Sequence, residues 1–411
     1  MRKLFVTAIV ALLPLYVYAA QKTSVDQLRQ ILSTSGVKSD KKLAAQISGL
    51  ELTDRLTRTE FNELSATLPG RKSKAALLLL ADVSAFLDPP VSAILPDPPP
   101  DTDAQHQILL RAVQLANDQA DMIPNFTAVR TTEHFQDVRT YPYSNKIEYY
   151  TPGSLRLIEE QTDDIRCSAG GDEVLEQPDK DLDNRTAGHP QPLMGMTIWG
   201  YHTIWGNLTW NIPNLTPEGF KPTGAFGPWL QAVTGDVPGA QREWAYWERS
   251  ASGRVAVFRF RIPQEDSHYT IDYNFTENPE NPFVSPDGKP YVVNPGYHGE
   301  IAIEPDTGKV ARIVAISDFG PGQPLSRANI ELEYGPVDVG GTSYLLPLRG
   351  VSTTSLTVAT HQYLFDSGAS IGELSDHFTV TSVDDLAFGS YRIYKARLRI
   401  LPLKSIDRPT K

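Results

Sequence analysis

The chain of 411 residues contains a single cysteine, Cys167. One thiol cannot form an intramolecular disulfide, and it cannot supply the cysteine clusters of zinc or iron–sulfur sites. Cys167 follows the apolar Ile165, so we interpret it as a small half-buried residue rather than a nucleophile. The eight histidines form no His-x-x-x-His or Glu-linked zinc motif. We therefore expect no metal and no cofactor, and leave open only a cluster that folding assembles.

The sequence also lacks phosphate-binding glycine motifs and an excess of positive charge. Neither a P-loop nor Gly-x-Gly-x-x-Gly occurs. The 38 Lys and Arg residues are outnumbered by 49 Asp and Glu residues, which gives a formal net charge of -11. Acidic and basic residues are interspersed, which argues against nucleic acid or an anionic membrane surface as the main partner.

Two segments match functional motifs incompletely. Asp179, Asp181 and Asp183 have the spacing that begins a calcium loop, but the sixth and twelfth positions hold Asn184 and Pro190 instead of Gly and Glu. A solvated acidic loop is the better interpretation.

The stretch "GASIG", residues 368 to 372, has the nucleophile-elbow pattern around Ser370. That pattern needs a strand leading into a helix and a distant His, whereas His377 is seven residues away. We interpret the stretch as a flexible loop, so the sequence offers no catalytic residue.

The first residues have the pattern of a secretory signal. Arg2 and Lys3 precede an apolar run from Leu4 to Val17, and Val17-Tyr18-Ala19 suits a signal peptidase. We expect residues 1–19 to be removed and the mature chain to be exported to the periplasm or the extracellular space. The alternative is an uncleaved anchor, but the run is shorter than the roughly 20 apolar residues needed to span a bilayer. No later run is long enough, so we expect no transmembrane segment in the mature chain.

The next part of the sequence predicts helices. Residues 20–88 contain four amphipathic segments, with Thr23 or Ser24 capping the first and Thr59 the third, and we expect them to form a helical bundle. Residues 89–102 are so rich in proline that we expect an extended linker without regular structure. Asp103 then caps a long helix that ends near Pro124.

From Asn125 onward the hydrophobic period changes to two. "GRVAVFRFRI", residues 253–262, places Phe258 and Phe260 on one face of a strand and Arg259 and Arg261 on the other. "EPDTGK", residues 304–309, suits a hairpin loop in which Gly308 takes a left-handed conformation. The predicted fold is α+β: the helical bundle, then a helix and a large curved antiparallel sheet over residues 103–404.

All six tryptophans fall between residues 199 and 247. Tryptophan suits both a sheet core and the wall of a pocket, because its large apolar ring carries one hydrogen-bond donor. The core interpretation is the simpler one. If the sheet binds a ligand, we expect aromatic residues to line its site: Trp199, Trp205, Trp244, Phe258 and Phe260.

Several segments carry a family resemblance, among them "YWERSASGRVAVFRFRIP" and "YHGEIAIEPDTGKVARI". The chain resembles a family of exported bacterial proteins of unassigned function, which implies no catalytic residues. More distantly, its order of helix and strands from "LANDQADMIPNFTAVRTTEHF" onward resembles the periplasmic lipoprotein-carrier and lipoprotein-sorting proteins. That likeness implies a half-barrel sheet that holds acyl chains. The proline-rich stretch, the helical leader and the insertions around residues 161–245 depart from it.

Three functions follow as hypotheses. The leading one is an exported envelope protein, not an enzyme, whose curved sheet binds a hydrophobic or lipid-like ligand. The second is a scaffold whose helical leader binds another envelope protein. The third is a hydrolase with residues assembled from distant loops.

Overall fold

The computed structural model describes residues 20–34, 39–122, 125–137, 155–168, 171–174, 208–211, 230, 233, 236, 240–250, 253–273, 291–366 and 369–393. The chain divides into two compact units, Met1–Pro90 and Val91–Lys411. Trp199, Trp205 and the acidic stretch around Asp181 lie outside the described residues. The same is true of the signal segment before Ala20.

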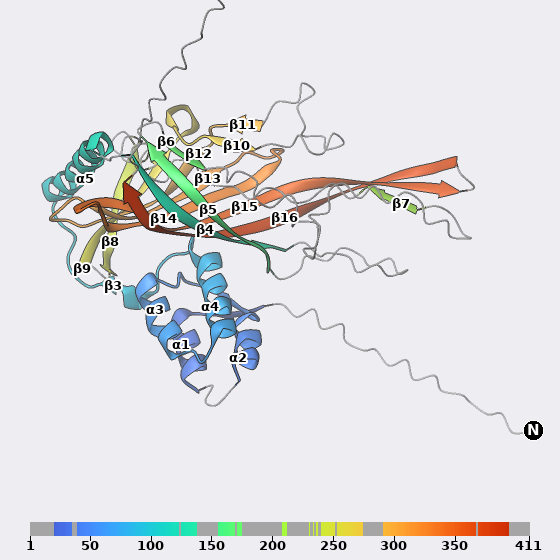
Figure 1. Ribbon diagram of the computed structural model, residues 1–411, viewed down its shortest axis with the longest axis horizontal. Coiled ribbons are helices and arrows are strands. Elements are labelled where there is room, and N and C mark those ends of the chain that lie inside the picture. The colour runs from blue at the N-terminus through green and yellow to red at the C-terminus, as the bar shows by residue number, and fades with distance from the viewer. Residues whose placement is uncertain are drawn as a thin grey trace, which may run out of the picture. The chain divides into compact units, whose positions relative to one another are not determined.

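The first unit contains four helices around one apolar core (Figure 1). They are α1 (Val25–Thr34), α2 (Asp40–Ile47), α3 (Arg58–Thr67) and α4 (Arg71–Ser84). Two short strands, β1 (Gln21–Thr23) and β2 (Leu50–Leu52), pair in parallel. The core takes the apolar stripe of each helix, for example Leu28, Ile47, Leu64 and Leu77. The helical period of the four amphipathic segments correctly predicted these helices.

Side chains outside the apolar stripes fix where these helices begin. Ser24 accepts a hydrogen bond from the N–H of Gln27, which confirms it as the cap of α1. Thr57, not the predicted Thr59, caps α3 through a capping box with Glu60. The start of α4 is held by Asp40 of α2, whose carboxylate accepts hydrogen bonds from the N–H groups of Lys72 and Ser73 and from the Ser73 hydroxyl.

The second unit is built on a 12-stranded sheet, counted over the described residues. Its order is β3-β8-β9-β12-β13-β14-β15-β16-β4-β5-β6, with β7 paired to β15, and all of its pairs are antiparallel. The predicted mixed fold with a large antiparallel sheet and one long helix is confirmed. The strands are β3 (Ile94–Leu95), β4 (Phe126–Gln136), β5 (Arg156–Ser168), β6 (Gly171–Val174), β7 (Leu208–Asn211), β8 (Gln241–Ser250), β9 (Gly253–Ile262), β12 (Gly296–Ile303), β13 (Val310–Asp318), β14 (Leu325–Val339), β15 (Thr342–Asp366) and β16 (Ala369–Ile393). A separate pair joins β10 (Ile271–Tyr273) to β11 (Tyr291–Val293).

The two longest strands, β15 and β16, have 25 residues each. Figure 1 shows them as a ribbon whose far end runs beyond the neighbouring strands, with β7 beside it. Ser370 lies in β16, opposite Phe365 of β15. The interpretation of this stretch as a flexible loop is wrong, and a strand in an antiparallel hairpin cannot supply the strand-to-helix turn of a nucleophile elbow.

The proline-rich stretch has more regular structure than its composition predicts. Val91–Ala93 form a 3-10 turn, and Ile94–Leu95 pair with Glu248 and Trp247 of β8. The prediction of a wholly irregular linker is therefore wrong for these residues. The prolines flank the short strand rather than interrupt it, and an edge strand needs hydrogen bonds on one side only. Trp247 donates from its indole nitrogen to the carbonyl of Pro98 at 2.9 Å.

The long helix is α5 (Thr102–Met122). It begins one residue before the predicted cap, because Asp101 and not Asp103 accepts from the N–H of Ala104. The predicted hairpin between β12 and β13 lies against this helix. Gly308 has a φ of 75°, as predicted, and the Arg111 guanidinium donates to the carbonyl of Pro305 at 2.7 Å. A Cβ on Gly308 would stand 2.7 Å from the Arg111 backbone, so only glycine fits this contact.

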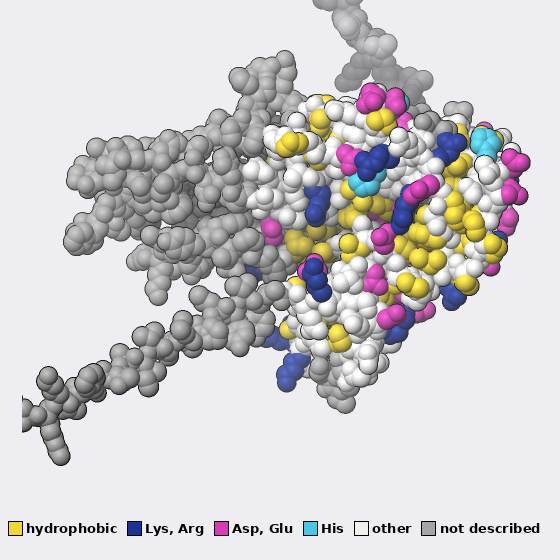
Figure 2. Space-filling model, turned by 180° about the vertical axis from the view of Figure 1, so that it is seen from behind, with side chains coloured by type: hydrophobic (Ala, Val, Ile, Leu, Met, Phe, Trp, Pro, Cys, Tyr) yellow, Lys and Arg dark blue, Asp and Glu magenta, His cyan; other side chains and the backbone are white. Residues whose placement is uncertain are grey.

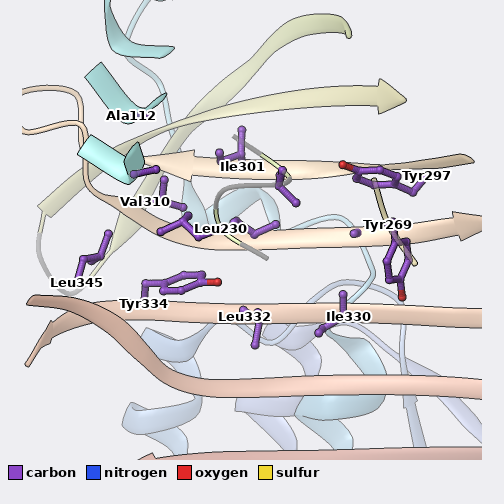
Figure 3. Close-up of a cluster of buried hydrophobic side chains, with 14 of the residues drawn as sticks. Ala112, Leu230, Tyr269, Tyr297, Ile301, Val310, Ile330, Leu332, Tyr334 and Leu345 are labelled. Atoms are coloured by element: carbon purple, nitrogen blue, oxygen red, sulfur yellow. The ribbon is translucent and has the colours of Figure 1, made fainter. Parts of the chain in front are cut away.

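The main core lies on the face of the sheet that α5 covers. Ile108, Leu109, Ala112 and Ala116 of α5 pack in one cluster with apolar side chains of the strands. Figure 3 shows part of this cluster, with Ala112 and Leu230 beside residues of β12, β13 and β14. We call this side of the sheet the inner face and the other side the outer face. On the molecular face drawn in Figure 2, the described Lys and Arg side chains lie among Asp and Glu side chains and hydrophobic ones.

Candidate functional site

A row of buried polar side chains lies on β4. Phe126 and Ala128 belong to the inner-face core, and alternation along a strand places every second residue after them on the same face. Those following residues are polar, and we call them the β4 stripe: Arg130, Thr132, His134 and Gln136. Arg130, Thr132 and Gln136 are only 2%, 5% and 3% exposed. The inner face therefore changes from apolar to polar within a single strand.

The neighbouring strands extend this polar surface. His134 lies opposite Asp384 of β16, and Asp384 lies opposite Ser352 of β15. The His134 Nδ1 and Asp384 Oδ1 atoms are 2.6 Å apart, and the Ser352 hydroxyl donates to Asp384 Oδ2 at 3.1 Å. Residues directly opposite one another in antiparallel strands share a face, so all three belong to the inner face.

On the other side of β4, the stripe contacts β5. Arg130 donates to Asp163 at 2.9 Å, and both side chains are buried. Gln161 donates to the second oxygen of Asp163 at 2.7 Å. Both carboxylates near the stripe are thus hydrogen-bonded, which is the usual condition for a buried charge.

Three atoms of the stripe have no hydrogen-bond partner in the part of the chain that the structure describes. They are Arg130 Nε, Thr132 Oγ1 and Gln136 Nε2. Leaving a buried polar atom unpaired costs about 1–3 kcal/mol, so such atoms are uncommon and need an explanation. Three of them on one strand and one face mark the β4 stripe as the candidate site.

His134 of the stripe, Asp384 and Ser352 contact one another in a row, but not in the order that nucleophilic catalysis needs. In a triad the histidine lies between the two other residues and takes the proton of the serine. Here Asp384 lies in the middle, and Ser352 donates to it. This arrangement orients side chains and does not activate a nucleophile.

A second polar cluster lies on the outer face. Arg312 lies opposite Ala302 in the β12–β13 pair. Ala302 alternates with the core residues Ile301 and Ile303, so Ala302 and Arg312 belong to the outer face. We define the Arg312 cluster as Arg312 with the three carboxylates around it, Glu248, Glu300 and Glu331. The guanidinium donates to Glu248 at 2.8 Å and to Glu300 at 3.3 Å, and its Nε lies 3.9 Å from Glu331.

The charges of the Arg312 cluster hold one another in place. Burial alone disfavours the charged guanidinium, but the three carboxylates outweigh it and raise the pKa of Arg312 well above its ordinary value. Tyr246 adds a hydrogen bond to Glu300 at 2.8 Å. In the described part of the chain, the Nη1 atom of Arg312 has no hydrogen-bond partner. The cluster ties β8, β12, β13 and β14 together.

A third polar group joins an insertion to the sheet. Asp236 accepts from the hydroxyl of Tyr297 at 2.7 Å and lies 2.5 Å from His268 Nδ1. Tyr297 is fully buried; burial and the Asp236 carboxylate raise the pKa of its hydroxyl. His268 is largely exposed, and the group works as a structural tie.

The aromatic residues named from the sequence are core residues where they are described. Phe258 and Phe260 are 1% and 3% exposed and belong to the inner-face core. Trp244 packs edge-on against Phe258, with ring centroids 5.4 Å apart. In the order of the sheet, six strands lie between β8, which carries Trp244, and β4 (β9, β12, β13, β14, β15 and β16).

Sequence reasoning missed the β4 stripe. The segment "NFTAVRTTEHF" was correctly predicted as a strand, and its alternation already places Arg130, Thr132 and His134 on the face of Phe126 and Ala128. A charged residue on the apolar face of a predicted strand was the signal that could have found it.

No family model, curated protein or solved structure matches the chain, so the geometry alone carries the functional argument. Among the described residues, no group of three or more His, Cys, Asp or Glu side chains could hold a metal ion. None of the described helices combines the length and apolar character needed to cross a membrane.

Proposed function

We propose that the chain is an exported envelope protein whose sheet binds a hydrophobic or lipid-like ligand on its inner face. The carrying observation is the β4 stripe, where unpaired buried polar atoms directly continue an apolar surface. An amphipathic ligand suits such a surface, because its apolar part can lie along Phe126 and Ala128 while its polar part meets the unpaired atoms.

The architecture supports this proposal. A large antiparallel sheet with a helix on its apolar face is compatible with the carrier-like likeness of the sequence. A half-barrel curvature of the sheet, a bundle-like leader and removal of a signal peptide are parts of the proposal. The aromatic residues Trp244, Phe258 and Phe260 then belong to the apolar core of the sheet and do not line the site.

The first test is extraction of lipid from the purified mature chain, beginning at Ala20, followed by mass spectrometry. We expect a co-purified lipid and displacement of an uncharged naphthylamine dye by added lipid. Absence of both would overturn the proposal.

A pair of variants on β4 locates the ligand. Ala128→Leu adds three carbon atoms to the inner face next to Arg130, and Val129→Leu places the same leucine side chain on the outer face, where it adds one carbon atom. We expect Ala128→Leu to weaken dye binding at least threefold and Val129→Leu to leave it unchanged. Circular dichroism must show both variants folded, since extra bulk in a packed site costs about 1–3 kcal/mol. Equal binding by the wild type and both folded variants would place the ligand elsewhere.

A further inference from the structure

The charges around the β4 stripe limit which polar group can bind there. Arg130 is already neutralised by Asp163, with which it forms a buried ion pair. Asp384 adds a second buried carboxylate, which contacts His134. Glu159 lies opposite His134 on β5 and adds another acidic residue at the exposed margin of the same face. The stripe therefore has no surplus positive charge with which to compensate a bound anion.

The unpaired atoms indicate what the site can bind. Arg130 Nε and Gln136 Nε2 are N–H donors, and the hydroxyl of Thr132 both donates and accepts. The two N–H donors need an acceptor from the ligand, and an oxygen atom that carries no hydrogen is a pure acceptor. A phosphate or carboxylate supplies such oxygens, but its charge would have to be buried without a counter-ion, which is strongly unfavourable.

We infer that the ligand's polar end is a neutral group with carbonyl oxygens, as in an acylglycerol ester, and not a phosphate or carboxylate. The inference rests on the proposed function, since it names the polar end of the same ligand. The ester carbonyls accept from Arg130 Nε and Gln136 Nε2, and a glycerol hydroxyl meets Thr132.

The test compares three ligands with one acyl or alkyl chain length against the dye on the full mature protein. They are a monoacylglycerol, the matching lysophosphatidic acid and the matching alkyl glucoside, which has hydroxyls but no ester. We expect the monoacylglycerol to displace the dye at least tenfold more tightly than the lysophosphatidic acid, and more tightly than the glucoside.

Variants connect that preference to the stripe. Thr132→Val and Gln136→Leu each remove one unpaired polar group, and we expect each to weaken monoacylglycerol binding about three- to tenfold, the usual effect of one hydrogen bond. Thr131→Val makes the same change on the opposite face of the same strand and should have no effect. Because the two stripe variants remove unsatisfied atoms, they should remain folded.

The outcomes separate the two proposals. If no ligand displaces the dye and the dye itself does not bind, the proposed function fails. If the lysophosphatidic acid binds as tightly as the monoacylglycerol or more tightly, only the assignment of a neutral ester is overturned. The same follows if the glucoside binds as tightly as the monoacylglycerol. Binding that is insensitive to both Thr132→Val and Gln136→Leu also overturns it.

Discussion

The two faces of the sheet bury polar side chains in opposite ways. On the outer face, each carboxylate of the Arg312 cluster lies near one guanidinium, and Arg312 contacts residues from three other strands of the sheet. On the inner face, the β4 stripe has an ion pair at Arg130 and a side-chain contact between His134 and Asp384, but three of its buried atoms have no partner among the described residues. Both clusters are similarly buried, so burial does not distinguish them.

The difference shows how a structural cluster is told from a binding surface. A cluster that satisfies its own charges contributes to the folded state as it is, whereas unpaired buried atoms lower stability until a partner arrives. Natural binding sites commonly reduce stability in this manner. The comparison therefore makes opposite predictions for substitutions on the two faces.

The largest effect should come from Arg312→Met. This change removes the buried cation that three carboxylates share, and breaking a buried ion cluster on one side costs about 3–5 kcal/mol. Urea unfolding followed by tryptophan fluorescence measures this loss of stability in the second unit alone, because all six tryptophans lie between residues 199 and 247. Arg259→Met is the control: Arg259 is 44% exposed and 3.4 Å from Glu300, so less than about 1 kcal/mol should be lost. Equal losses would remove the distinction between the paired cluster and a surface pair.

A smaller effect of opposite sign should come from Thr132→Val. The valine has nearly the shape of threonine but no buried hydroxyl to leave unpaired, so we expect a gain of about 1 kcal/mol in the ligand-free protein. Thr131→Val, on the outer face, should change stability by less than about 0.5 kcal/mol. The same urea titration measures both. A loss of stability in Thr132→Val would mean that its hydroxyl is already satisfied.

The smallest effect concerns Asp40, whose carboxylate accepts hydrogen bonds at an exposed helix start in the first unit. Hydrogen bonds, first from the Ser73 hydroxyl and then from its N–H, lower the pKa of Asp40 below its ordinary 3.8. The stability that Asp40 contributes is therefore present above about pH 4 and is lost as the pH falls through its lowered pKa. Helical circular dichroism during thermal unfolding should show this loss, and Ser73→Ala should reduce it. An unchanged pH profile in Ser73→Ala would contradict the assignment.

The regular parts of the fold follow from the sequence because they depend on local alternation. Phe258 and Phe260 alternate with Arg259 and Arg261, and their strand, its inner face and the Gly308 hairpin are found as predicted. What local patterns could not show is pairing between distant segments. Ile94 and Leu95 become a strand because β8 is adjacent, and the ribbon of β15 and β16 runs through residues whose composition resembles a loop.

The candidate site depends even more on distant pairing. His134 and Asp384 are separated by 250 residues and meet only through the pairing of β4 with β16. Their types alone predict nothing, since each is an ordinary strand-surface residue in its own segment. Trp244, which the sequence suggested as a ligand contact, packs against Phe258 in the core.

The pairing of β4 with β16 also has a consequence for the order in which the protein forms. The strand that begins at Phe126 pairs with a strand that ends at Ile393, so both strands and everything between them must be synthesised before these two meet. Contacts of such high sequence separation make folding slow. Until β16 has been synthesised, the edge of β4 that pairs with it has unpaired backbone N–H and C=O groups. These groups make the incomplete chain prone to aggregation and dependent on chaperones.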